Sequence, residues 1–213
     1  MGKAANSSIS LKQIHVTDNF WNKYVHLVKD VIIPYQWDIL NDKLEDVETS
    51  HCIENFKIAA GEKEGEFQGA VFQDTDVAKW LEAVGFVLNY ERDEKLEALA
   101  DETIELIGRA QLPDGYLNTY FIIKEPDGRW SNLMEGHELY TAGHMIEAAV
   151  AYYEATGKHR FLEIVSKFAD LICETFGPEE GKIHGYPGHQ EIELALVKLY
   201  RVTNEKKYLD LAK

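Results

Sequence analysis

The alternation of apolar and polar residues is most regular between Gly136 and Ile172, where it predicts two helices joined by a short turn. The first helix has a polar start and is then apolar on almost every side, which is typical of a buried helix. The second helix, after Lys158, carries charged residues between its apolar positions and is predicted to be an outer, amphipathic helix. We expect the rest of the chain to be organised around this hairpin.

The same hairpin pattern recurs along the chain. Residues 150–166 align without gaps on residues 197–213, and the turn residue Gly157 falls opposite Asn204. Glycine and asparagine both tolerate the left-handed conformation that ends many helices. A weaker third copy lies at residues 80–100. A repeated hairpin of this size predicts an all-α stack, which is a solenoid if it stays open and a toroid if it closes.

Shorter elements are predicted near the start of the chain. Residues 1–8 are expected to form a disordered leader, and the alternation over residues 9–16 favours a short edge strand. An amphipathic helix should begin after Asp18 or Asn19 and end at Pro34.

The middle of the chain contains two further helices and a long loop. Asp74 or Thr75 is predicted to cap the first helix, and the second should run over residues 93–110. Pro-Asp-Gly turns at residues 113–115 and 126–128 lie in the loop, and the first turn should lead into an extended piece.

Two long loops occupy the same place in the repeat, each after an outer helix and before an inner one. Both end in a Gly-His pair, at His137 and at His189. If the helices pack as a toroid, both histidines should project into one mouth. Long ordered loops tend to be functional, so we expect these histidines to hydrogen-bond a polar ligand, although His137 could also be a solvent-exposed terminal residue. His144 lies deeper on the helix and is expected to be a satisfied core histidine.

Several acidic residues lie near the predicted mouth, and glycosidic chemistry requires two carboxyl groups ~5–9.5 Å apart. The candidates are Asp74, Asp76, Glu138, Glu191 and Glu193. Each has a simpler structural explanation, because acids stabilise the first turn of a helix. His189 and Glu193 have the spacing of two metal ligands, but no third ligand is visible in the sequence, so a metal site is not favoured there. Loop aromatics that could stack on a sugar ring are Trp37, Tyr116, Tyr120, Trp130, Tyr140 and Tyr186.

Composition excludes several classes of function. The net charge of −15 argues against nucleic acid or an anionic membrane as the main partner. No stretch approaches the ~20 apolar residues of a membrane span, and no signal peptide is recognisable, so a cytoplasmic protein is expected. Cys52 and Cys173 are expected to be reduced core thiols. The sequence contains no nucleotide, phosphate-loop or serine-nucleophile motif.

Five segments resemble glycoside hydrolase family 127, the β-L-arabinofuranosidase family. They are VIIPYQW (31–37), FQDTDVAKWLE (72–82), QLPDGYLNT (111–119), the helix that starts with HELY (137–151) and GHQEIELAL (188–196). These motifs fall at the loop ends described above. The resemblance implies an (α/α)6 barrel with short extended segments in its loops. Residues 9–213 would be its N-terminal portion, and the catalytic domain would be truncated at Lys213.

The same resemblance implies a function. Family members are exo-acting, retaining glycosidases that release L-arabinofuranose from plant-derived glycans, with a zinc-bound cysteine as nucleophile and a glutamate as general acid/base. Those residues and the Zn2+ ligands match nothing before Lys213, so we expect no catalytic residue or metal ligand in this chain, and we expect the chain alone to be inactive. The family's sugar-binding histidines match His137 and His189, and Asp74, Asp76 and Glu191 are weaker candidates for binding substrate.

Two other classes remain open. One is a different α/α-barrel sugar enzyme, such as an epimerase or a polysaccharide lyase, whose activity would be independent of metal. The other is a non-catalytic α-solenoid binding module, for which a polar, capped terminal repeat and an open groove would be expected. A homodimer is a further option for the assembly.

Overall fold

The computed structural model describes residues 9–213, and the predicted leader at residues 1–8 lies outside that part of the chain. The described residues form helices and loops without a β-strand, and the one extended pairing among them is an isolated bridge between Phe176 and Ile183. The prediction of an all-α fold is therefore confirmed. In chain order, the α-helices are α1 (Asn19–Leu27), α2 (Ile33–Leu40), α3 (Cys52–Ala59), α4 (Asp74–Tyr90), α5 (Glu94–Ala110), α6 (Thr119–Ile123), α7 (Glu138–Thr156), α8 (Arg160–Thr175), α9 (Ile192–Thr203) and α10 (Lys206–Leu211).

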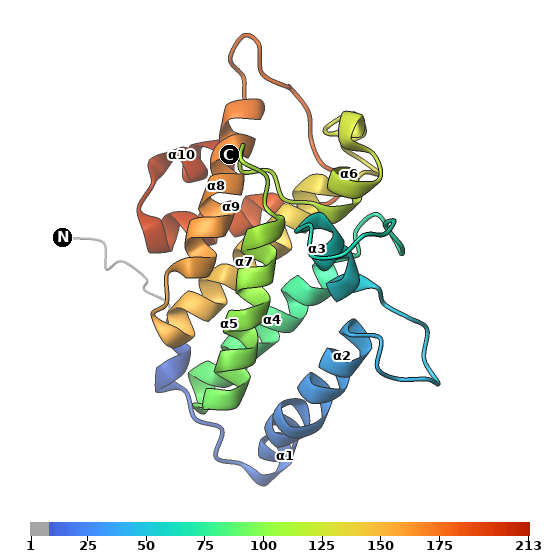
Figure 1. Cartoon of the computed structure of the whole chain (residues 1–213). Helices are drawn as coiled ribbons and strands as arrows, with labels where there is room; N and C mark the ends of the chain where they lie inside the picture. Colours follow the sequence, from blue (N-terminus) through green and yellow to red (C-terminus); the bar gives the residue numbers. More distant parts are fainter. Residues whose placement is uncertain (1–8) are drawn as a thin grey trace, which may run out of the picture.

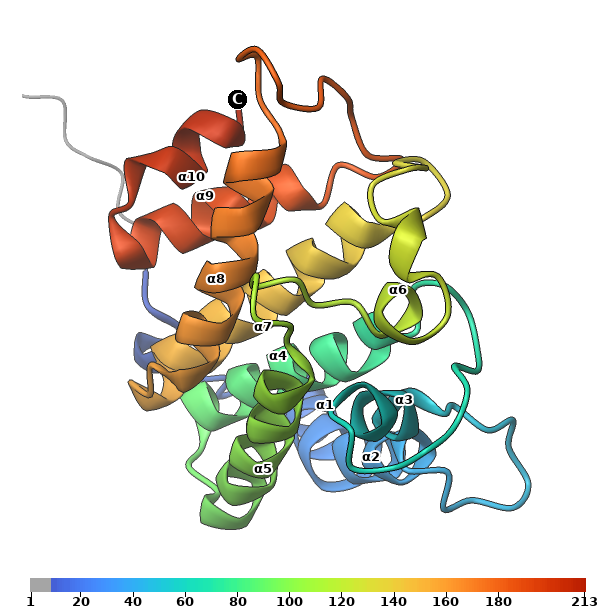
Figure 2. The ribbon, with the colours of Figure 1, turned by 45° about the horizontal axis from the view of Figure 1, so that its top comes forward.

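The helices form two layers (Figures 1 and 2). Helix α7 packs most extensively against α4 and then against α9, so α4, α7 and α9 form an inner row. Helices α5, α8 and α10 each pack against the inner helix that precedes them in the chain. The three inner helices start on the same side of the molecule, near α6 (Figure 2). This arrangement confirms the predicted stack of helical hairpins.

Helix α7 is central because it has no polar face. Every residue from Met145 to Tyr152 is buried, and Glu147 is the one charged residue in this run. The neighbouring helix α4 comes close because Gly85 faces α7. A Cβ atom at this position would lie 2.9 Å from the backbone carbon of Ala151 and 3.0 Å from the backbone nitrogen of Tyr152. At Gly85 the backbones of the two inner helices therefore approach each other directly, with no side chain between them.

The predicted repeat extends to the turns. Gly157 ends α7 with φ of +75°, and Asn204 ends α9 with φ of +60°. The backbone N–H of each donates to the carbonyl of an equivalent tyrosine, Tyr153 or Tyr200, at 2.7 Å in both cases. The alignment of glycine on asparagine thus marks one helix-ending conformation used twice.

Two predictions near the start of the chain are wrong. Residues 9–16 form a 3-10 turn at Leu11–Gln13 instead of an edge strand, because Ser10 caps that turn and no neighbouring strand is available for pairing. Pro34 does not end the helical run. The segment Val28–Ile32 forms a π-helical turn, and Pro34 then lies in the first turn of α2, where its missing N–H leaves no hydrogen bond broken.

Two predictions in the middle of the chain also need correction. Neither Asp74 nor Thr75 caps α4. The helix already includes both residues, and the side chain of Asp74 accepts hydrogen bonds from Thr119 instead. The piece that follows Gly115 is not extended throughout, since Asn118 caps the short helix α6 by accepting from the backbone N–H of Phe121. The turn itself is as predicted, with Gly115 at φ of +91°.

The described helices give no sign of a membrane segment. None of the helices within residues 9–213 combines the length and the apolar character that crossing a bilayer requires. The cytoplasmic location remains a prediction from the sequence.

The close approach of α4 and α7 generates a first prediction. Gly85→Ala should lower the free energy of unfolding by about 1–3 kcal/mol, because the added methyl group meets the backbone of α7, which has no room to retreat. The matched control is Gly108→Ala in α5. Its methyl group would meet the side-chain ends of Arg160 and Ile164, and it should change stability by less than about 1 kcal/mol. Urea denaturation of both variants checks this, and equal effects would contradict it.

Candidate functional site

The two Gly-His pairs meet at the starts of the inner helices. The ring centroids of His137 and His189 lie 5.2 Å apart, and the ring of Tyr140 lies 5.7 Å from the first and 4.9 Å from the second. Phe72, which precedes α4, packs 5.1 Å from the ring of His137. The prediction that both histidines project into one mouth is therefore confirmed. We call the group Phe72, Lys79, His137, Tyr140 and His189 the histidine mouth.

The backbone orients the ring of His137. This residue is the N-cap of α7 and has φ of +55°, a left-handed conformation that is uncommon outside glycine. Its ring Nδ1 lies 2.6 Å from the carbonyl oxygen of Glu135. A carbonyl oxygen only accepts, so Nδ1 of His137 donates to it. Nε2 is therefore the ring nitrogen that remains for whatever enters the mouth.

Lys79 is a member of the histidine mouth that sequence reasoning missed. Its ammonium group donates to the hydroxyl of Tyr140 at 3.1 Å and to the hydroxyl of Thr75 at 3.2 Å. Thr75 lies one turn earlier on α4, and this i, i+4 spacing was the available signal. Lys79 thus places a positive charge and one remaining N–H donor beside Tyr140, whose ring packs against both histidines. Of the other candidate aromatics, Tyr116 and Trp130 pack on each other at 5.3 Å within the loops.

Asp74 holds the fold around the mouth. Its side chain is 2% exposed, and its two oxygens accept from the backbone N–H of Thr119 at 2.7 Å and from the hydroxyl of the same residue at 2.5 Å. Burial raises the pKa of Asp74 to about 6, and the hydrogen bonds from Thr119 oppose that rise. Asp76, by contrast, is exposed and accepts from the side chain of Gln73 at 2.7 Å.

Glu138 also makes hydrogen bonds that stabilise the fold around the mouth. It accepts from the backbone N–H of Trp130 at 2.7 Å and from the hydroxyl of Tyr116, so it ties both segments of the long loop to the start of α7. The residue is 2% exposed, and burial raises its pKa to about 6.

Glu191 turns away from the solvent and toward α7. Its Oε1 lies 3.5 Å from Nδ1 of His144, and Glu147 lies beside both. Gly143 makes this approach possible, because a Cβ atom there would lie 2.6 Å from the Cγ atom of Glu191. The expectation for His144 is wrong: neither of its ring nitrogens has a hydrogen-bond partner, since Glu191 stays beyond a good hydrogen-bonding distance.

The cysteines do not fit a zinc-thiolate centre. Cys52 is fully buried and donates to the carbonyl of Gln73 at 3.3 Å, and burial raises its pKa well above the usual value. Burial also raises the pKa of Cys173 to about 11. Both thiols are free, but only Cys52 is the core thiol that was expected, since Cys173 is partly exposed. Neither belongs to the group of metal-ligating side chains found among residues 9–213.

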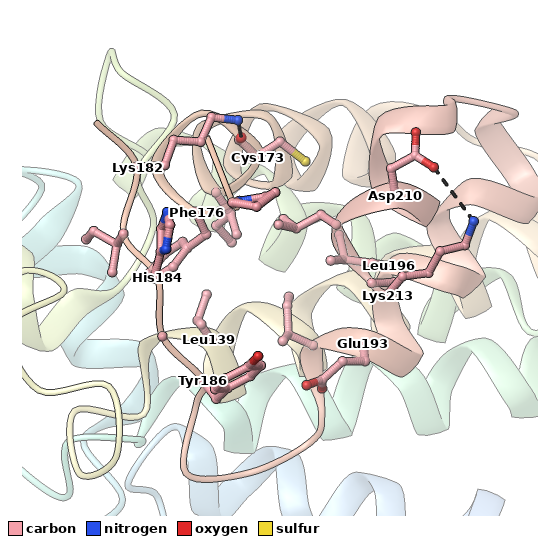
Figure 3. A pocket seen from close by; sticks show the side chains of 18 of the residues that line it. Leu139, Cys173, Phe176, Lys182, His184, Tyr186, Glu193, Leu196, Asp210 and Lys213 are labelled. Carbon is pink, nitrogen blue, oxygen red and sulfur yellow. Dashed lines mark hydrogen bonds and ion pairs between the residues drawn. The ribbon is translucent and has the colours of Figure 1, made fainter. Parts of the chain in front are cut away.

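A cavity of about 780 Å³ lies apart from the histidine mouth (Figure 3). It is enclosed by the end of α8, the loop that follows it, α9 and α10, with Phe176, Leu196 and Leu139 among its apolar lining residues. Neither His137 nor His189 reaches it. We place the candidate site at the histidine mouth, because polar groups from three segments converge there, which is typical of ligand sites.

Helical hairpins whose inner helices open on a polar mouth define an α/α-type helical-repeat protein. Residues 13–213 match the family model described as "Beta-L-arabinofuranosidase, GH127 catalytic domain". The chain therefore belongs to glycoside hydrolase family 127.

Relatives support this assignment and the fold. The chain is 46% identical to a non-reducing end β-L-arabinofuranosidase of Bifidobacterium longum subsp. longum, over 93% of this chain and 33% of the relative. A crystal structure of a GH127 β-L-arabinofuranosidase from Geobacillus stearothermophilus is 63% identical, with a TM-score of 0.92 over 93% of this chain and 31% of its own. A second solved GH127 β-arabinofuranosidase is 38% identical, with a TM-score of 0.88 over 96% of this chain and 32% of its own. The predicted fold class is thus confirmed, and the chain spans about a third of the length of these relatives.

The buried carboxyl group of Asp74 generates a pH prediction. Its pKa is raised from 3.8 to about 6, so the folded chain holds the proton more tightly than the unfolded chain. The resulting stability is full below the unfolded value and is lost as the pH rises through about 6. Relative to Asp74→Asn, the native protein should therefore lose roughly 2 kcal/mol of unfolding free energy between pH ~4 and ~7, at about 1.4 kcal/mol per pKa unit. Urea denaturation of both proteins across this range tests it, and parallel pH profiles would refute it.

Proposed function

We propose that this chain forms one wall of the sugar pocket of a β-L-arabinofuranosidase. The observation that carries the proposal is the meeting of His137 and His189, 5.2 Å apart between ring centroids, in a chain of family 127. The named activity of the relatives at 46% and 63% identity supports this substrate class.

The chemistry of the histidine mouth suits a furanose. Nε2 of His137 can hydrogen-bond one sugar hydroxyl, and the ammonium group of Lys79 has one N–H left to donate to another. The rings of Tyr140 and Phe72 supply apolar surface beside these polar groups. Asp76 and Glu191 remain candidates for contacts with substrate, whereas the contacts of Asp74 with Thr119 favour an indirect role.

The proposal places the nucleophile, the acid/base and any zinc outside these 213 residues. High pKa values keep both cysteines of the chain protonated at neutral pH, and a protonated thiol is a poor nucleophile and a poor metal ligand. No reaction step is therefore assigned to this chain. Membership of family 127 favours a glycoside hydrolase over an epimerase, a lyase or a solenoid binding module.

The role of the histidines is tested by substitution in the chain extended to the length of its relatives. His137→Ala and His189→Ala should each lower kcat/KM for a chromogenic β-L-arabinofuranoside about ten- to hundredfold, because each removes a hydrogen bond to the sugar. His159→Ala, at the turn between α7 and α8, is the matched control and should leave kcat/KM unchanged. An unchanged kcat/KM in both His137→Ala and His189→Ala would contradict the proposal.

The proposed placement of the nucleophile outside this chain generates a separate prediction. The 213-residue chain, folded and free of additional domains, should release no measurable L-arabinose from the same substrate, because both of its cysteines are protonated and Cys52 is also fully buried. The assay needs a circular-dichroism spectrum to show that the chain is helical. Any turnover would contradict this prediction, and turnover that survives Cys52→Ala and Cys173→Ala would demand a different nucleophile within the described residues.

A further inference from the structure

Beneath the histidine mouth, three metal-ligating side chains converge from two inner helices. His144 and Glu147 lie one turn apart on α7, and Glu191 is the residue that precedes α9. One ligand atom from each lies within 4.8 Å of the other two. This is the one such group of three found among residues 9–213, and it differs from the His189 and Glu193 pair considered from the sequence.

The group contains polar atoms that the protein leaves without partners. Both ring nitrogens of His144 and one carboxylate oxygen of Glu191 are shielded from solvent and make no hydrogen bond. Nδ1 of His144 and Oε1 of Glu191 face each other at 3.5 Å. Buried polar groups are normally hydrogen-bonded, so an unpaired imidazole beside two carboxyl groups needs an explanation. An ion between them would bind one ring nitrogen of His144 and one oxygen of each carboxyl group.

The donor set suits a divalent transition metal. One imidazole and two carboxylates are ligands that Zn2+ accepts at about 2.0–2.2 Å, with a fourth position left for water. The imidazole distinguishes the group from an all-oxygen site for Ca2+ or Mg2+.

Lys198 would compete with a bound ion for the carboxylate of Glu147. Its ammonium group contacts Glu147 and lies 3.9 Å from Glu82, so it neutralises the group while no ion is bound. The other nearby cation, Lys79, is hydrogen-bonded to Tyr140 in the histidine mouth. An ion that binds Glu147 must therefore displace Lys198, and removal of this lysine should favour the ion.

We propose that His144, Glu147 and Glu191 form a binding site for a divalent transition-metal ion. The site lies at the junction of α7 and α9, directly below the residues proposed to bind sugar. It is made by this chain alone and contains no cysteine, so it is separate from the zinc-thiolate centre that the family resemblance implies. The inference does not depend on the proposed function, because the site would bind its ion whether or not the mouth binds a sugar.

Calorimetric titration of the untagged chain with Zn2+ tests the proposal. We expect one Zn2+ per chain, with binding at least about tenfold weaker in His144→Gln. The matched control His159→Gln removes an exposed histidine and should bind as tightly as the native chain. Lys198→Met should bind more tightly, because the competing ammonium group is gone. If these substitutions acted only by removing a structural contact, Lys198→Met would not bind Zn2+ more tightly than the native chain.

Other outcomes overturn the proposal. If the native chain binds no Zn2+, or if all variants bind it equally, the three side chains hold water and the acidic surface accounts for any uptake. If Ca2+ binds as tightly as Zn2+ in the native chain, the site is not one for a transition metal. Should His144→Gln fail to fold, Co2+ bound to the native chain decides the matter. Its absorption spectrum must lack a thiolate charge-transfer band, and NMR signals of the His144 ring must respond to the ion.

Discussion

The burial of α7 on all sides is the constraint on which the rest of the structure depends. A helix without a polar face must be covered by neighbours, and α4, α8 and α9 provide that cover. Gly85 lets α4 come against the α7 backbone, and Gly143 lets Glu191 do so from the start of α9. Because the inner helices are parallel, their first turns gather at one edge. The polar residues of those first turns then lie close together, and no additional structural feature is needed to bring them there.

This dependence explains why the site is composed of residues from loop ends. Buried loops carry backbone groups that need partners, and here carboxylates supply them. Asp74 accepts a hydrogen bond from the backbone N–H of Thr119, and Glu138 accepts one from the backbone N–H of Trp130. These two acidic side chains near the mouth therefore hold the loops in place. The imidazoles of His137 and His189 are left as the groups that face outward. The acidic residues near the mouth thus stabilise the loops, and the two histidines remain available to a ligand.

The fold was largely predictable from the sequence because its signals are local. The apolar pattern of α7 and the repeated turn at Gly157 and Asn204 fix hairpins whatever else surrounds them. The failures involve partners distant in sequence. The bond from Thr119 draws Asp74 away from capping α4, and Glu191 meets His144 across 47 residues, a distance that no periodicity reveals. Pro34 misled for a different reason, since a π-helical turn before it absorbs the break.

The left-handed backbone of His137 has a consequence for how the sequence can change. A non-glycine residue in this conformation costs of order 1 kcal/mol or more, and glycine would relieve that cost. Thermal stability alone would therefore favour glycine at position 137, whereas the proposed contact with a sugar requires the imidazole of His137. Stability and the proposed ligand recognition thus place opposite demands on one residue.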